Sequence, residues 1–163
     1  MNGKIPSLSP LQLKSYCFPI VNVRANPNGK ATALTSAQQE VGFFPVPGQP
    51  NHWNLQLAVK LASADANNPF FYEVEIHALG VVEMSGDVPA EKRETLAVVN
   101  GLGILYGACR EMLMNVTARS LFGPCSIPSL SFAQVLQEAK EHQIEQQKSR
   151  IGEEVKSTAA LAG

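Results

Sequence analysis

The segment 103–136 constrains this chain most, because it stays apolar even where its helical pattern stops. Its first half has the spacing of a long apolar helix. The connector that follows, residues 121–130, contains two prolines and no charged side chain. Loops of soluble domains usually run over the surface, so an uncharged apolar connector has to be covered by a core, a subunit interface or another chain. We therefore expect a protein that works by association rather than by chemistry.

The composition narrows the class of protein. A length of 163 residues predicts one domain, residues 1–152, with a flexible C-terminal tail, residues 153–163. A net charge of -1 argues against a nucleic-acid surface or a polybasic membrane contact. Three widely spaced cysteines indicate reduced thiols and a cytoplasmic location. We find no apolar run of the roughly 18 residues that a membrane span needs.

The first half of the chain predicts strands. Residues 53–61 are apolar at every odd position, and residues 71–82 alternate in the same way, so the two runs predict an antiparallel hairpin. Residues 11–24 predict a third strand whose apolar phase changes near Pro19, which indicates a β-bulge. A weaker fourth strand is expected within residues 31–44.

The second half predicts helices. Asp87 and an acidic first turn indicate a helix start, while Gly101 and Gly103 predict a break before a long helix over residues 104–120. A further helix is expected from Ser131 onward. The long helix is apolar around most of its circumference, so one side should contact the sheet and another side a second subunit. The residues predicted at that oligomer interface are Leu105, Cys109, Met112 and Val116.

Residues that could carry chemistry are sparse. The histidines and cysteines have no metal-ligand spacing, and Gly101 and Gly103 lack the third glycine of a dinucleotide-binding loop. We expect no metal and no enzymatic activity. The alternative is an enzyme such as a thioester hydrolase, with Glu111 as its acid; the other role for Glu111 is an ion pair with a neighbour such as Arg110.

Two segments resemble the SecB protein-export chaperones. Residues 103–111, Gly-Ile-Leu-Tyr-Gly-Ala-Cys-Arg-Glu, resemble the family's Asn-Ile-Leu-Phe-Pro-Tyr-Ala-Arg-Glu segment without gaps. Residues 119–132 are similar to its Arg-Gly-Thr-Phe-Pro segment and the Asn-Phe-Asp-Ala-Leu segment that follows. Glu73 and Val74 fit a Cys-Glu-Val strand motif. The resemblance covers about residues 10–145.

The resemblance implies an α+β fold, with a four-stranded antiparallel sheet packed against a long broken helix and a C-terminal helix. It further implies a homotetramer, a dimer of dimers, that holds non-native polypeptides in the cytoplasm. Such chaperones pass precursors to the SecA motor without ATP and without a cofactor. By matching position, Phe132 and Leu136 would line a client groove, and Phe71 and Glu73 would lie on the sheet surface that docks the motor.

Four further side chains are predicted to line the client site, because of their size and their position in the strand alternation. The alternative for each is an ordinary place in the protein core. These four are Phe18, Ile20, Phe43 and Phe44. The near-neutral charge differs from the acidity of the family, and Arg24 stands where a family acid is expected. The alternative function is therefore a SecB-like chaperone of a toxin–antitoxin pair, which protects a dedicated antitoxin client.

Overall fold

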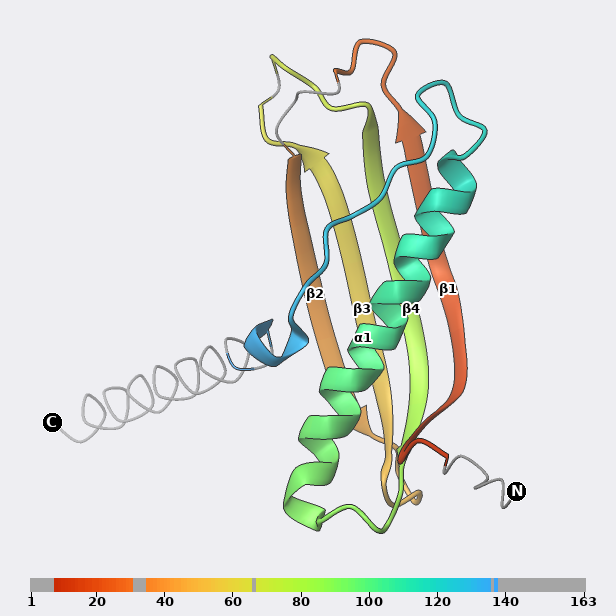
Figure 1. The fold of residues 1–163 in the computed structure, drawn as a ribbon, viewed down its shortest axis with the longest axis vertical. Coiled ribbons are helices and arrows are strands. Elements are labelled where there is room, and N and C mark those ends of the chain that lie inside the picture. The colour runs from red at the N-terminus through yellow and green to blue at the C-terminus, as the bar shows by residue number, and fades with distance from the viewer. Residues whose placement is uncertain (1–7, 31–34, 66, 136, 138–163) are drawn as a thin grey trace, which may run out of the picture. The chain divides into compact units, whose positions relative to one another are not determined.

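The computed structural model describes residues 8–30, 35–65, 67–135 and 137, and the chain divides into two compact units, residues 1–130 and 131–163. The first unit is a sheet with one long helix on it (Figure 1). Its elements are β1 (Leu11–Ala25), β2 (Thr35–Pro45), β3 (His52–Ser63), β4 (Tyr72–Met84) and α1 (Ala90–Thr117). The predicted α+β class is confirmed.

The four strands form one antiparallel sheet in the order β1-β4-β3-β2. The predicted hairpin is confirmed as β3 and β4, in which Leu57 lies opposite Ala78. The predicted irregularity in β1 is also confirmed, because the register with β4 shifts between Cys17 and Ile20, around Pro19. Proline has no N–H to donate to a neighbouring strand, so it suits such a position on an edge strand.

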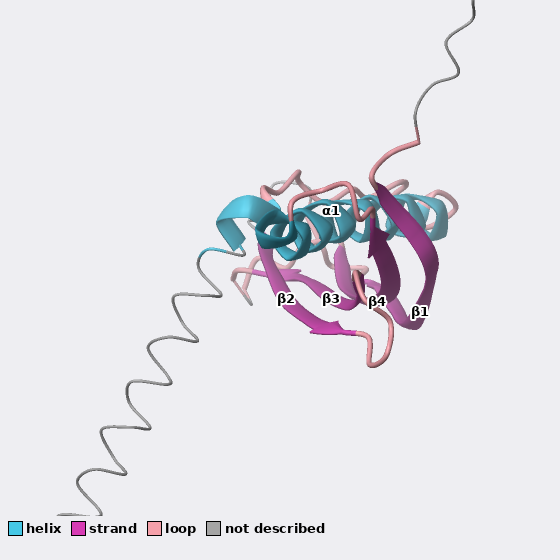
Figure 2. Cartoon of the chain, turned by 90° about the horizontal axis from the view of Figure 1, so that it is seen from below, coloured by secondary structure: helices cyan, strands magenta, loops and turns pink. Residues whose placement is uncertain are grey.

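Alternation along β3 and β4 gives the sheet two different faces. Figure 2 shows α1 lying along one of them, which we call the helix-side face, and we call the opposite one the open face. The strand side chains buried on the helix-side face are Leu11, Trp53, Leu55, Leu57, Val59, Leu61, Tyr72, Val74, Ile76, Ala78, Val82 and Met84. Their burial against α1 forms the core of this unit and leaves the open face as a separate surface.

The helix α1 is continuous over 28 residues, so the predicted break at Gly101 and Gly103 is wrong. Gly101 is buried where α1 packs on the sheet, with Leu55 and Val82 against it. A methyl group there would overlap Leu55, so the glycine permits close packing rather than a turn. Asp87 is not the helix cap either; it accepts a hydrogen bond from the Ser85 hydroxyl at 3.0 Å.

Burial along α1 corrects part of the predicted oligomer interface. Leu105 and Cys109 are 0% exposed, and Leu105 lies against Gly80 of β4, so both belong to the chain's own core. Met112 is half-buried and Val116 is exposed. Among the described residues, α1 is also the one helix that is long and apolar enough to cross a membrane, by length and composition alone. Many of its apolar side chains are buried against the sheet, so they belong to the core of this unit.

The connector after α1, residues 118–130, returns across the helix-side face, and we call it the strap (Figure 1). Its own side chains Cys125 and Ile127 are buried, as its apolar composition predicts. The Thr117 hydroxyl accepts a hydrogen bond from the Cys125 N–H at 2.8 Å, and the Tyr72 hydroxyl donates to the Gly123 carbonyl at 2.6 Å. The Tyr106 hydroxyl donates to the Pro128 carbonyl. The strap is thus fixed along its length to strand and helix of the same chain.

In the second unit, residues 132–135 and 137 are helical, where the last helix is predicted. The remainder of that helix and the tail, residues 153–163, lie outside the described residues. The division of the chain into residues 1–152 and a flexible tail therefore stays a prediction.

Candidate functional site

The open face carries an apolar hollow of about 420 Å³ that spans all four strands. Phe44 on β2 and Leu79 on β4 are large apolar side chains that line it, and they are 55% and 38% exposed. The side chains that reach it from this face are Ser15, Cys17, Phe44, Asn54, Gln56, Leu79 and Val81. None of them is charged, so the hollow suits an uncharged apolar group.

A change of side-chain type along β4 creates this hollow. The open-face positions of β4 are polar at Glu73, Glu75 and His77, and then become apolar at Leu79 and Val81. Large apolar side chains gathered on a surface commonly mark an interaction site. The second half of β4 therefore has apolar side chains on both faces of the sheet.

Two amides border the apolar side chains. Asn54 and Gln56 alternate with the buried residues of β3 and lie opposite Val81 and Leu79. In the part of the chain that the structure describes, neither side-chain amide makes a hydrogen bond. These groups can bind the backbone of an extended segment, which presents N–H and C=O groups at regular intervals.

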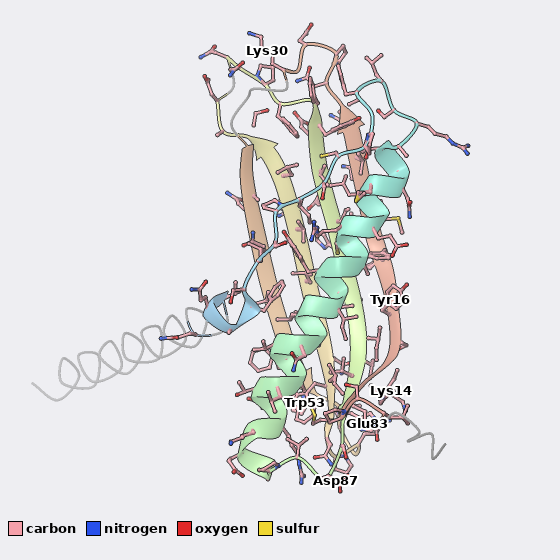
Figure 3. The ribbon with its side chains drawn as sticks, viewed as in Figure 1. Lys14, Tyr16, Lys30, Trp53, Glu83 and Asp87 are labelled. Carbon is pink, nitrogen blue, oxygen red and sulfur yellow. The ribbon has the colours of Figure 1, made fainter. Side chains whose placement is uncertain are left out.

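An ion pair lies next along the strands from the apolar hollow, beyond Ser15 and Val81. The Lys14 ammonium donates to Glu83 Oε2 at 2.9 Å, and Figure 3 shows the two side chains together near the start of β1, with Tyr16 further along that strand. This hydrogen bond, together with the positive charge of Lys14, holds the pKa of Glu83 below its ordinary value. Both groups are well exposed to solvent.

A second hollow of about 380 Å³ lies further along the open face, and we call it the charged hollow. Its charged side chains have both signs. Lys60 Nζ lies 3.7 Å from Glu75 and 3.5 Å from Glu40, and His77 Nε2 lies 3.1 Å from Glu75. Arg24 is opposite Glu73 in the register of β1 and β4. This end of the face is mixed in charge rather than acidic.

The predicted client residues fall on different surfaces. Phe44 lines the apolar hollow, and Ile20 lies beside it on the open face, opposite His77. Phe43 is opposite Leu55 and so belongs to the helix-side face, as does Phe18, which meets the Tyr16 ring edge-on at 5.8 Å. These four side chains therefore do not line one groove.

The remaining predicted residues are placed as follows. Phe132 lies in the short helical segment of the second unit, and Leu136 lies outside the described residues. Phe71 is half-buried and stacks on Phe122 with ring centroids 4.5 Å apart, so it holds the strap. Glu73 is exposed at the edge of the charged hollow.

Leu79, Val81, Cys17 and Asn54 were not among the residues predicted for the site. A signal for the first two was present in the sequence: the face of β4 that carries Glu73 and His77 continues with apolar residues. Cys17 gave no such signal, because the phase of β1 depends on its bulges. Apolar residues on the otherwise polar face of a half-buried strand therefore indicate exposed apolar surface in the folded protein.

The three thiols differ in environment. Cys17 is exposed in the apolar hollow, whereas burial raises the pKa of Cys109 to about 11 and raises that of Cys125 as well. A thiol that stays protonated is a poor nucleophile. Within the ranges that the structure describes, no group of three or more histidine, cysteine, aspartate or glutamate side chains could hold a metal ion.

Comparison with solved structures finds this fold in a chaperone. The SecB-like chaperone Rv1957 of Mycobacterium tuberculosis, in complex with a ChAD peptide from the Rv1956 HigA1 antitoxin, matches with a TM-score of 0.57 and 14% sequence identity, over 74% of this chain and 91% of that chain. A Streptococcus agalactiae protein of unknown function has a TM-score of 0.48 and 12% identity, over 73% of this chain and 97% of that chain. No protein-family model and no curated protein matches the sequence. The sheet with its long helix is a SecB-like fold.

Proposed function

We propose that this protein is an ATP-independent chaperone that holds an aggregation-prone polypeptide in the apolar hollow of its open face. The single observation that supports this most is Phe44, an aromatic side chain 55% exposed that lines, together with Leu79, a hollow without charged side chains. A holding chaperone needs apolar surface and free hydrogen-bonding groups, and it needs no reactive residue or cofactor. The SecB-like fold is consistent with this role.

The energetics favour weak, repeated contacts. Burying one large apolar side chain contributes about 1.5–3 kcal/mol, while association costs several kcal/mol in lost freedom. One hollow would therefore bind a client only modestly. Several hollows on one assembly would raise the affinity without new contacts, because the second contact becomes intramolecular.

We propose that copies of the chain assemble through the outer side of α1. Four apolar side chains of α1 are between 39% and 46% exposed. They are Leu96, Ile104, Met114 and Val116. A dimer of dimers is the expected state, and light scattering after size-exclusion chromatography measures it; a monomer at micromolar concentration would contradict the assembly.

The client we favour is a dedicated one of the antitoxin type, in the cytoplasm. One solved structure with this fold is a chaperone bound to an antitoxin peptide. Export through SecA is the second candidate, and it receives less support from the charges. A motor that docks on acidic residues would meet Lys60 between Glu40 and Glu75, and Arg24 opposite Glu73.

Suppression of aggregation tests the chaperone role. We expect stoichiometric protein to reduce the light scattering of a heat-aggregating reporter enzyme, and Phe44→Asp to weaken this effect while leaving the circular dichroism spectrum unchanged. Leu121→Asp is the matched control, because Leu121 is 76% exposed but lies on the strap, away from the hollow. No suppression by the unaltered protein would remove the proposal.

A second experiment separates a dedicated client from general holding. Antitoxin candidates encoded by neighbouring genes are co-expressed with the chain, and their solubility and affinity are compared with those of the denatured reporter enzyme. Tighter binding of one antitoxin by at least tenfold would favour the dedicated role. Equal affinity for all clients would favour the general, export-type holdase.

A further inference from the structure

We propose that the outer edge of β2 is a second binding site for the client, which adds an extended segment of its own backbone to the sheet as a further strand. The segment is recognised through its N–H and C=O groups, so the site accepts many sequences. This inference takes its occupant from the proposed chaperone function, and it adds a backbone contact to the side-chain contact in the apolar hollow.

The strand β2 is paired on one side. The order β1-β4-β3-β2 leaves β2 at one edge of the sheet and β1 at the other (Figure 1). β2 pairs with β3 in an unbroken register, from Thr35 opposite Ser63 to Pro45 opposite Trp53. In the part of the chain that the structure describes, no backbone hydrogen bond reaches β2 from any segment other than β3.

The alternation of the ladder shows which backbone groups point outward. The Val46 N–H donates to the His52 carbonyl at 3.0 Å, one step beyond the pair of Pro45 and Trp53. In an antiparallel pair, residues that bond the neighbouring strand alternate with residues whose N–H and C=O point away from it. Even-numbered residues of β2 therefore bond β3. The residues whose backbone groups point outward are Ala37, Gln39, Val41 and Phe43.

Two further observations agree with this assignment. The Met84 N–H donates to the Asn51 carbonyl at 2.9 Å, so odd-numbered residues of β3 bond β4 and even-numbered ones are left for β2. Pro45 is odd-numbered, so its missing N–H falls on the outward side, where a proline costs the sheet no hydrogen bond. The outer edge of β2 thus presents a regular row of donors and acceptors.

The two edges of the sheet differ in how they are protected. The pairing of β1 with β4 shifts at Lys14 and again around Pro19, and bulges, proline and lysine on an edge all hinder the addition of a strand. From Thr35 to Phe44, β2 has no proline and no shift in register, and Glu40 is its one charged residue. The edge of β2 is therefore the one that is suited to pair.

The charge on β2 favours a client over a second copy of the chain. A two-fold axis that pairs all four outward residues brings the two copies of Glu40 directly opposite each other, and opposed like charges destabilise a strand pair. A client is free of that symmetry. Phe44 lines the apolar hollow from the same strand, so a segment that leaves the hollow can continue along this edge. Val41 and Phe43 are half-buried on the helix-side face, so apolar residues at alternate client positions would cover them.

Backbone N-methylation of a peptide tests the pairing. The probe is a labelled nine-residue peptide of alternating threonine and valine, compared with one form methylated at four alternate residues and another methylated at four consecutive residues. The alternate form keeps one complete row of N–H groups, whereas the consecutive form loses two from each row. We expect the alternate form to bind within about twofold of the unmodified peptide and the consecutive form about tenfold or more weakly, by fluorescence anisotropy.

One variant tests the same row on the protein. Val41→Pro removes an outward N–H that β3 does not use, so it should weaken binding of the unmodified peptide about threefold to tenfold. Val41→Ala keeps that N–H and separates the loss of the side chain from the loss of the donor. Equal binding to these two variants would contradict the backbone contact.

Hydrogen exchange followed by NMR tests the unaltered protein. The amides of Gln39, Val41 and Phe43 should exchange faster than those of their even-numbered neighbours, and saturating unmodified peptide should slow them. Equal binding of the two methylated peptides, or unchanged exchange at saturation, would overturn this inference while aggregation suppression still supports the proposed function. Protection that rises with protein concentration in the absence of peptide would assign the edge to a second copy and overturn the client as its occupant. Failure of every peptide to bind, together with no suppression of aggregation, would overturn both proposals.

Discussion

Gly101 of α1 lies directly against Leu55 of β3, where the helix packs on the sheet. A methyl group at position 101 would overlap Leu55 and crowd Val82. Gly101→Ala should therefore lower the free energy of unfolding by about 1–3 kcal/mol, the usual cost of overpacking a core. Urea denaturation monitored by circular dichroism measures this change.

Gly103 supplies the matched control for that substitution. It lies in the same helix, two residues away, and no atom would meet a side chain there within 4 Å. Gly103→Ala should raise the free energy of unfolding by roughly 0.5–1 kcal/mol, since alanine is the better helix former. Equal effects of the two substitutions would mean that helix propensity, not close packing, decides the role of Gly101.

The hydroxyl of Thr117 fixes the strap from inside the core. It donates to the Leu113 carbonyl at 2.7 Å and accepts from the Cys125 N–H at 2.8 Å, and Thr117 is fully buried. Thr117→Val keeps the shape but leaves that N–H without an acceptor, which should cost about 1–3 kcal/mol of stability. Thermal unfolding measures it, and Thr117→Ser should recover most of the loss if the hydrogen bond is responsible.

Much of this fold was predictable because its strands obey a local rule. The alternation in β3 and β4 follows from one buried face, so the hairpin could be predicted without any tertiary information. The role of Gly101 could not, because a close approach between helix and sheet exists only after folding. From the helix sequence alone, without the sheet that packs on it, the same glycine predicts a break in the helix.

The candidate site was harder to predict because it depends on register. Phe43 and Phe44 are neighbours in a strand, so they must point to opposite faces, and only pairing with β3 decides which one lies in the hollow. In β1, the shift in the pairing with β4 between Cys17 and Ile20 changes the phase of Phe18 relative to Ile20. Bulk alone therefore identified candidate residues without assigning their face.

The Lys14–Glu83 pair predicts a pH effect at the border of the apolar hollow. Because Lys14 lowers the pKa of Glu83 in the folded state, the pair stabilises the fold above the unfolded pKa of the carboxyl group. That contribution is lost as the pH falls through the folded pKa. Lys14→Gln should raise the pKa of Glu83 toward its ordinary value, and NMR titration of the side-chain carboxyl resonance measures it. An unchanged titration would show that the pair does not form in solution.

Cys17 gives a direct probe of the apolar hollow, because it is the exposed thiol among the three cysteines. A thiol reagent such as DTNB should modify one thiol rapidly at neutral pH, while Cys109, with a pKa of about 11, and Cys125 react only on unfolding. Cys17→Ser should abolish the fast phase. A client seated in the hollow should then slow the modification of Cys17 in proportion to the fraction bound. Full-rate modification at a saturating client concentration would place the client elsewhere, whereas protection that disappears in Phe44→Asp would locate it on the open face between β1 and β2.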